Sequence, residues 1–99
     1  MSIKQHDTAG PLTITCTDNG AVVNLTTATT VKVIATGAAT FTRTVTGSSA
    51  GVVVMPWQTA DVANVGLLQL EVEVTWGDGT IQTFPSDGFL RVNIVRDLG

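Results

Sequence analysis

The stretch LQLEVEVTWGDGTIQTF, residues 68–84, decides the fold class of this chain. Its first nine residues alternate apolar and polar side chains, a pattern typical of a β-strand with one buried face. Gly77-Asp78-Gly79 then supplies residues that tolerate positive φ, and the run Thr80-Ile81-Gln82-Thr83-Phe84 follows as a second strand. The stretch therefore predicts a β-hairpin whose long strand buries Leu68, Leu70, Val72, Val74 and Trp76.

Shorter alternating runs begin at Leu12, Val31, Phe41 and Leu90, and an apolar run covers Val52-Val53-Val54. The two commonest residue types are threonine and valine, which are β-branched and favour strands over helices. Turn signals such as Asp18-Asn19-Gly20 and Gly47-Ser48-Ser49-Ala50-Gly51 separate the runs. We expect seven to nine short strands in mainly antiparallel sheets, stacked as a β-sandwich without crossover helices.

One short segment, Gln58 to Val65, has the pattern of a single helical turn rather than of a strand. Thr59 or Asp61 can cap its start, and Gly66 can end it. The segment is too short to be a structural helix. It therefore does not change the all-β prediction.

The apolar side chains on one face of each alternating run predict one core for a single domain, residues 1–99. A composition of 43% hydrophobic and 13% charged residues favours collapse over disorder. Cys16 continues the inward phase of its strand, so we expect a buried free thiol. The other residues predicted to share the core are Leu12, Ile14, Val33, Leu70, Val72, Val74, Val92 and Ile94.

The charges and the single cysteine exclude several classes of function. The net charge is −3 and the five basic residues are scattered, so we expect no nucleic-acid partner. One cysteine cannot form an internal disulfide. Apolar stretches are too short for a signal peptide or a membrane span, so we expect synthesis in the cytoplasm and no membrane contact.

Residues that could carry chemistry have simpler interpretations. His6 is the only histidine and lacks converging partners, so a surface position is expected. Glu71 and Glu73 share one strand face, as solvent-facing residues spaced by two do. Asp18, Asp61, Asp78 and Asp87 fall in predicted turns, where a carboxylate accepts hydrogen bonds from the backbone. We therefore expect no enzyme activity, no metal site and no cofactor.

The aromatic residues suggest where another protein could bind. Trp76 continues a buried phase, whereas Trp57 follows Pro56 at a strand exit and is expected to be partly exposed. The apolar stretch from Gly51 to Trp57 carries no charge, and sparse charges leave sheet edges poorly protected. The candidate protein interface therefore comprises Trp57, Phe84 and Pro85.

From about Lys4 onward, the order of motifs resembles the N-terminal domain family of the baseplate upper protein of tailed bacteriophages. That family is a small immunoglobulin-like β-sandwich. The resemblance covers nearly the whole chain and rests on the order and spacing of turns and strand starts rather than on one diagnostic motif. The matching segments are 4–8, 11–13, 17–20, 23–26, 51–53 with Trp57, 61–66, 78–79 and 83–88.

The resemblance implies an immunoglobulin-like antiparallel sandwich that serves as a structural component of a virion, in the tail, the baseplate or a fibre attachment point. The implied partners are other virion proteins, and a symmetric homo-oligomer in the particle is expected. Two alternatives stay open at this point. One is a capsid decoration protein, and the other is a carbohydrate-binding or adhesion module that uses Trp57.

Overall fold

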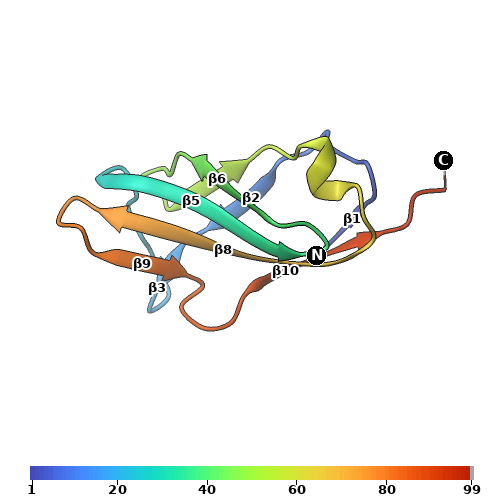
Figure 1. Ribbon diagram of the computed structural model, residues 1–99. Coiled ribbons are helices and arrows are strands. Elements are labelled where there is room, and N and C mark those ends of the chain that lie inside the picture. Colours follow the sequence, from blue (N-terminus) through green and yellow to red (C-terminus); the bar gives the residue numbers. More distant parts are fainter. Residues whose placement is uncertain (99) are drawn as a thin grey trace.

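A computed structural model describes residues 1–98 of the chain as an elongated all-β molecule, 47 × 22 × 20 Å (Figure 1). Two long antiparallel strands, β5 (Ala28–Gly37) and β8 (Gly66–Trp76), pair at the centre of its main sheet. The other strands are β1 (Ser2–Lys4), β2 (Leu12–Thr15), β3 (Thr17–Asp18), β4 (Ala21–Val22), β6 (Phe41–Val45), β7 (Val52–Met55), β9 (Ile81–Phe84) and β10 (Leu90–Val95).

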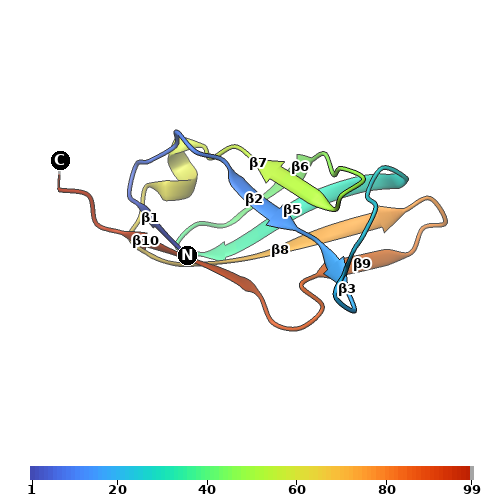
Figure 2. The same cartoon turned by 180° about the vertical axis from the view of Figure 1, so that it is seen from behind.

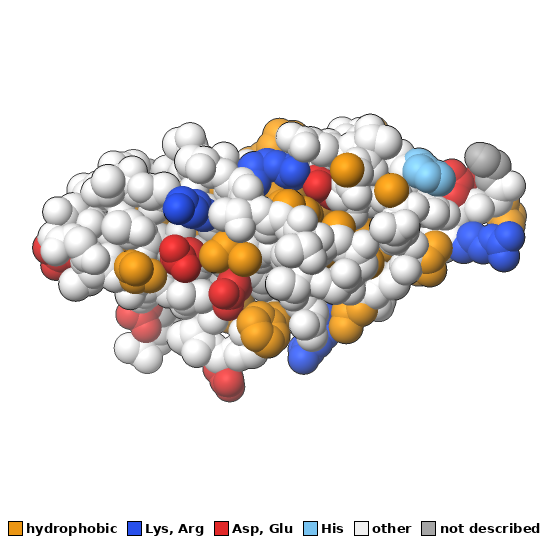
Figure 3. All heavy atoms as spheres, viewed as in Figure 1, with side chains coloured by type: hydrophobic (Ala, Val, Ile, Leu, Met, Phe, Trp, Pro, Cys, Tyr) orange, Lys and Arg blue, Asp and Glu red, His pale blue; other side chains and the backbone are white. Residues whose placement is uncertain are grey.

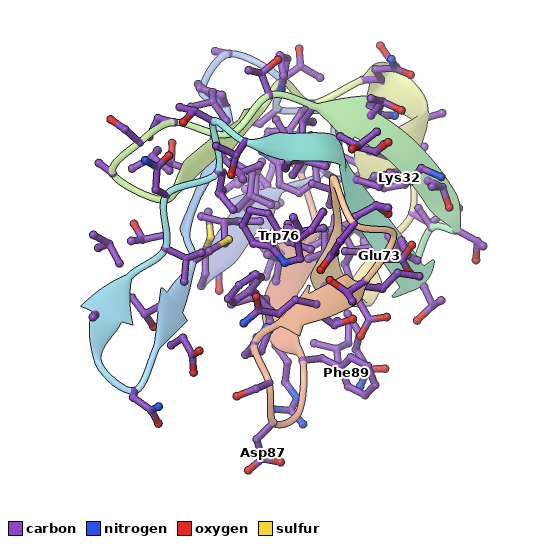
Figure 4. The ribbon with its side chains drawn as sticks, turned by 90° about the vertical axis from the view of Figure 1, so that its left-hand side faces the viewer. Lys32, Glu73, Trp76, Asp87 and Phe89 are labelled. Atoms are coloured by element: carbon purple, nitrogen blue, oxygen red, sulfur yellow. The ribbon has the colours of Figure 1, made fainter. Side chains whose placement is uncertain are left out.

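The main sheet has the order β1-β10-β8-β5-β6. One edge of β8 pairs with β5, and its other edge is shared by two strands. The first half of β8 pairs with β10, and the second half pairs with β9 through the predicted hairpin at Gly77–Gly79. The loop between β9 and β10 bulges away from the sheet, with Asp87 at its tip (Figure 4).

A smaller layer covers one face of the main sheet. It contains the antiparallel pair β2–β7, and β2 runs on into β3, which pairs with β4 (Figure 2). The inward residues of both layers form one cluster, which includes Leu12, Ile14, Val53 and Met55 from the small layer. All eight residues predicted to share the core, together with Cys16, belong to this cluster.

The structure corrects three details of the predicted fold. The described residues, 1–98, form ten strands rather than seven to nine, because several strands contain only two or three residues. One pairing is parallel, between β1 and β10, so the main sheet is mixed. The helical turn is a 3₁₀ helix at Thr59–Val62 whose N-cap is Gln58, rather than Thr59 or Asp61.

Trp76 was placed in the core by the sequence pattern, and the structure puts it at the end of the core, partly buried. Its indole Nε1 donates to Gln82 Oε1 at 3.2 Å, which ties the end of β8 to β9. Figure 4 shows the Trp76 ring at the centre of this end of the molecule. None of the described helical segments is long and apolar enough to cross a membrane.

Candidate functional site

The two edges of the small sheet differ in how their backbone groups are satisfied. On the β7 edge, the chain folds back on itself: Gly47 bridges Val53, and the Ser48 N–H donates to the Val52 carbonyl at 3.0 Å. Gly51 makes this corner possible, because a Cβ added there would lie 2.7 Å from the Cys16 carbonyl oxygen, and its φ is +77°. We call this side, residues 41–62, the closed side.

A buried ion pair holds the closed side together. Arg43 on β6 donates from Nη1 and Nη2 to the two carboxylate oxygens of Asp61, at 2.7 and 3.0 Å. Asp61 is only 3% exposed, and its Oδ2 also accepts from the Gln58 N–H at 2.8 Å. The hydrogen bonds that Arg43 donates to the Asp61 carboxylate raise the pKa of the Arg43 guanidinium, which also stacks on Phe41. The pair therefore fastens β6 to the 3₁₀ helix.

The opposite edge, formed by β2 and β3, is open. The Cys16 N–H donates to the Gly51 carbonyl, and the Cys16 carbonyl accepts from the Val23 N–H. In an antiparallel ladder, alternate residues direct their backbone groups to the same side. Residues 12, 14 and 16 therefore face β7 and β4, and the amides and carbonyls of Thr13, Thr15 and Thr17 face outward. Among residues 1–98, no strand pairs with this outer edge.

Across from this edge, β10 is also only partly covered. The Asn93 N–H donates to the Met1 carbonyl, and β1 pairs with residues 93–95 alone. Residues 90–92 therefore have no β1 residue paired with them on this edge. In Figure 2, β2 and β3 lie on the side of the molecule where β9 and β10 run, and among residues 1–98 no strand pairs with both groups. We call this gap the open seam.

Two shallow grooves mark the open seam. One, of about 190 Å³, lies between residues 12–15 and residues 90–92. The other, of about 260 Å³, lies between Ile14–Asn19 and the segment 84–87. Both are smaller than the roughly 300–1,000 Å³ of typical small-molecule sites. The seam therefore suits an extended polypeptide better than a small ligand.

The outward side chains of the small sheet at β2 and β7 are uncharged, whereas the facing walls of the two grooves carry Arg91 and Asp87. The outward side chains of β2 and β7 are Thr13, Thr15, Val52 and Val54, and Val54 is 46% exposed. The outer face of the main sheet differs: Figure 3 shows basic, acidic and hydrophobic side chains mixed across β5 and β8. Lys32 lies directly across from Glu73 in this face (Figure 4). Charge therefore protects the large face but not the small one.

The residues predicted as the protein interface are separated by the fold. The expected exposure of Trp57 was wrong, because its side chain is only 5% exposed, in the core beside the closed side. Phe84 is 3% exposed and also belongs to the core. Pro85 is half-buried and lines the groove at the open seam. Of the three, only Phe84 and Pro85 adjoin one another at the seam, and their interface role stays a prediction.

The other candidate residues have local partners or none. His6 is exposed as predicted, with its Nδ1 3.8 Å from Asp97 Oδ2. Burial raises the pKa of the Cys16 thiol. Thr80 donates to Asp78 from its hydroxyl and its N–H, and these hydrogen bonds lower the pKa of that carboxyl. Within residues 1–98, no group of three or more His, Cys, Asp or Glu is positioned to hold a metal ion.

Turn chemistry explains Asp78 and the hydrogen bond that Asp61 accepts from the Gln58 N–H, but sequence reasoning missed the ion pair of Asp61 with Arg43. The two residues are 18 positions apart, in a strand and a turn that only the fold brings together. A weak local signal existed in the spacing of Gln58 and Asp61, since an acidic residue at the third helical position is typical of a capping box. Nothing in that spacing indicated the arginine.

No family model matches this chain, and no curated protein or solved structure matches it at a significant level. The resemblance to the baseplate upper protein family therefore stays a prediction from the order of its motifs.

Proposed function

We propose that this chain is a structural docking module of a bacteriophage virion, in the tail, the baseplate or a fibre attachment point, acting by protein–protein contact without catalysis. The observation that carries the docking role is the open edge formed by β2 and β3, whose outward-facing residues Thr13, Thr15 and Thr17 are uncharged. Natural proteins usually protect such edges with charges, prolines, bulges or a neighbouring chain. Pro11 and Asp18 protect only the two ends of this edge, and Thr13, Thr15 and Thr17 between them carry no charge, so we propose that a neighbouring chain covers the middle.

The assignment to a virion rests on the motif order, and the strand order supports the immunoglobulin-like part of it. The neighbours β10, β8 and β5, with β6 beyond them, follow the order of the G, F, C and C′ strands of such domains. The pair β2–β7 takes the place of strands B and E in the opposing sheet. We therefore propose an immunoglobulin-like sandwich whose first small-sheet edge is unpaired.

Symmetric repetition in a particle would allow individually weak edge contacts to hold the protein in place. In a particle, many copies bind together, so each contact adds to the avidity of the whole assembly. A decoration protein on the capsid would use the same edge at a different location. The carbohydrate-binding alternative is not carried further, because it needed Trp57 as an exposed stacking platform and that side chain is buried.

The test counts copies of the protein in particles purified from the host that produces it, by quantitative mass spectrometry. The variant Thr13→Lys/Thr15→Lys places two charges on the open edge, and Glu73→Lys on the main-sheet face is the matched control. We expect the edge variant to fold but to be lost from particles, while the control is incorporated normally. Immunogold labelling then separates tail from capsid.

Absence of the wild-type protein from purified particles would contradict the virion role. Normal incorporation of the folded edge variant would contradict the assignment of docking to β2 and β3.

A further inference from the structure

We infer that the occupant of the open edge is a second copy of this chain, paired antiparallel through β2 and β3 with Thr15 opposite its own counterpart. The inference rests on the proposed docking role of this edge and names its partner. Its basis is the position of the outward-facing backbone groups, the absence of charge along the edge and the placement of Pro11.

The outward residues are symmetric about Thr15. Thr13 and Thr17 lie two residues before and after it, and all three direct an amide and a carbonyl outward. A two-fold axis at Thr15 places Thr13 opposite Thr17 of the second copy. Each such pair can exchange two backbone hydrogen bonds, so all three outward residues are satisfied at once. An isologous contact of this kind closes on itself as a dimer.

The two-fold registers with an axis closer to Pro11 leave a backbone group without a partner. An axis at Ile14 would place Thr17 opposite Pro11 of the second copy, and an axis at Thr13 would place Thr15 opposite it. Proline has no N–H to donate, so either register loses a ladder hydrogen bond. The axis at Thr15 avoids Pro11, because residue 11 then lies opposite Asn19 in the turn beyond β3.

The chemistry of the edge also suits an identical strand. Residues 12–17 include no Asp, Glu, Lys, Arg or His, and Cys16 is a buried thiol, so two copies meet without like-charge repulsion along this stretch. Asp18 lies opposite Leu12 of the second copy, which places the two Asp18 carboxylates at opposite ends of the contact. On the outer face, threonines lie across from threonines, a pairing that stabilises antiparallel strands.

The position of Thr15 in the fold agrees with this axis. Both grooves of the open seam are lined by Ile14 and Thr15, so Thr15 lies where they meet. A strand centred there continues the small sheet along both grooves. The closed side offers no comparable edge, because Gly47 and Ser48 already occupy the β7 edge.

The first test is sedimentation velocity of the full chain over a dilution series. Thr15→Pro removes the outward amide while leaving the amides that face β7 in place, and Thr15→Val keeps the amide as the control. We expect a concentration-dependent dimer for the wild type and for Thr15→Val, and a monomer for Thr15→Pro. Circular dichroism confirms that each variant folds, and a wild type that is monomeric at every concentration overturns the inference.

The second test fixes the register and does not depend on the proline variant. Hydrogen-bonded antiparallel partners have Cα atoms about 5.5 Å apart, within the range of disulfide geometry. Under mild oxidation, we expect Thr15→Cys to form a covalent dimer and Thr13→Cys alone to remain monomeric, with the buried Cys16 present in both. A mixture of Thr13→Cys and Thr17→Cys should cross-link. Equal cross-linking of Thr13→Cys and Thr15→Cys overturns the register.

The two proposals fail in different ways. If the wild type is monomeric and yet Thr13→Lys/Thr15→Lys is lost from particles, the edge docks a different virion protein, and the second-copy inference is wrong. If the dimer and the register hold while the lysine variant is incorporated normally, the inference stands and the proposed docking role of the edge in the particle is wrong.

Discussion

The closed side and the open seam differ in how the backbone N–H and C=O groups at the two edges of the small sheet are hydrogen-bonded. On the closed side, the chain supplies its own neighbour through Gly47 and Ser48 and fastens it with the Arg43–Asp61 ion pair. At the open seam, Thr13, Thr15 and Thr17 direct backbone groups outward and carry no charge, and Asp18 lies only at the end of the edge. This difference is the basis of our proposal that the open seam binds another chain, while the closed side stabilises the fold.

Both sides share one core, and disrupting it should have the largest effect. Val72 is fully buried in β8, so Val72→Asp places an unpaired charge in the core and should unfold most of the population. Glu73→Lys changes the neighbouring residue on the outer face and should leave the protein folded. Thermal unfolding followed by circular dichroism compares the two, and equal melting temperatures would show that the assigned strand phase is wrong.

The next prediction compares the free energy of unfolding after removal of one carboxylate from the closed side and one beside the open seam. Asp61→Ala leaves Arg43, whose side chain is 18% exposed, without its buried partner, so the expected cost is about 1.5–3 kcal/mol, the range for hydrogen bonds to a charged group. Asp18→Ala removes an exposed carboxylate beside the open seam and should change the free energy of unfolding by less than about 0.5 kcal/mol. Urea denaturation measures both. Similar losses of stability would mean that the ion pair does not fasten the closed side.

Alanine substitutions at two glycines with positive φ, one on the closed side and one beside the open edge, compare how tightly the backbone packs at the two places. Gly51 on the closed side has φ +77° and backbone within 3 Å of an added Cβ, whereas Gly20 in the β3–β4 turn has φ +81° and open space around it. Alanine at either position pays the cost of positive φ, about 1–2 kcal/mol. Only Gly51→Ala also displaces the Cys16 carbonyl, so it should destabilise the protein clearly more than Gly20→Ala. Equal costs in urea denaturation would contradict the tight packing of this corner.

The smallest effect is expected at the Asp78 turn, away from both sides. Hydrogen bonds from Thr80 lower the pKa of Asp78 below its ordinary value of 3.8. The charged carboxylate therefore stabilises the folded state above that value, and this contribution is lost as the pH falls through the lower pKa of the folded state. Asp78→Asn keeps a hydrogen-bond acceptor but does not titrate.

Thermal unfolding between neutral and strongly acidic pH compares this variant with the wild type. The wild type should lose slightly more stability than Asp78→Asn on acidification below the ordinary pKa. Parallel pH profiles would show that the Asp78–Thr80 hydrogen bonds do not favour the charged carboxylate.

The core could be predicted because alternation is a local property of the sequence. Leu12, Val72 and Ile94 lie in different strands, yet each reveals its buried face through its own neighbours. The hairpin at Gly77–Gly79 was predicted for the same reason, because its turn chemistry is local.

Properties that depend on how distant segments meet could not be predicted. The parallel pairing of β1 with β10 joins the two ends of the chain, and the Arg43–Asp61 pair joins a strand to a distant turn. Trp57 follows a proline at a strand exit, a position that favours exposure, but the corner between β7 and the 3₁₀ helix folds it into the core. The location of the open edge follows from the order of the strands in the two sheets, which alternation does not encode.

Residue-resolved amide hydrogen exchange tests the central claim most directly, because it reports each backbone N–H along β2 and β3. In dilute solution, the amides of Thr13, Thr15 and Thr17 should exchange fast, while those of Ile14 and Cys16, which face β7, should exchange slowly. At high protein concentration, the three threonine amides should become protected together. Protection of these threonine amides in the dilute protein would contradict the open edge and the contrast between the two sides.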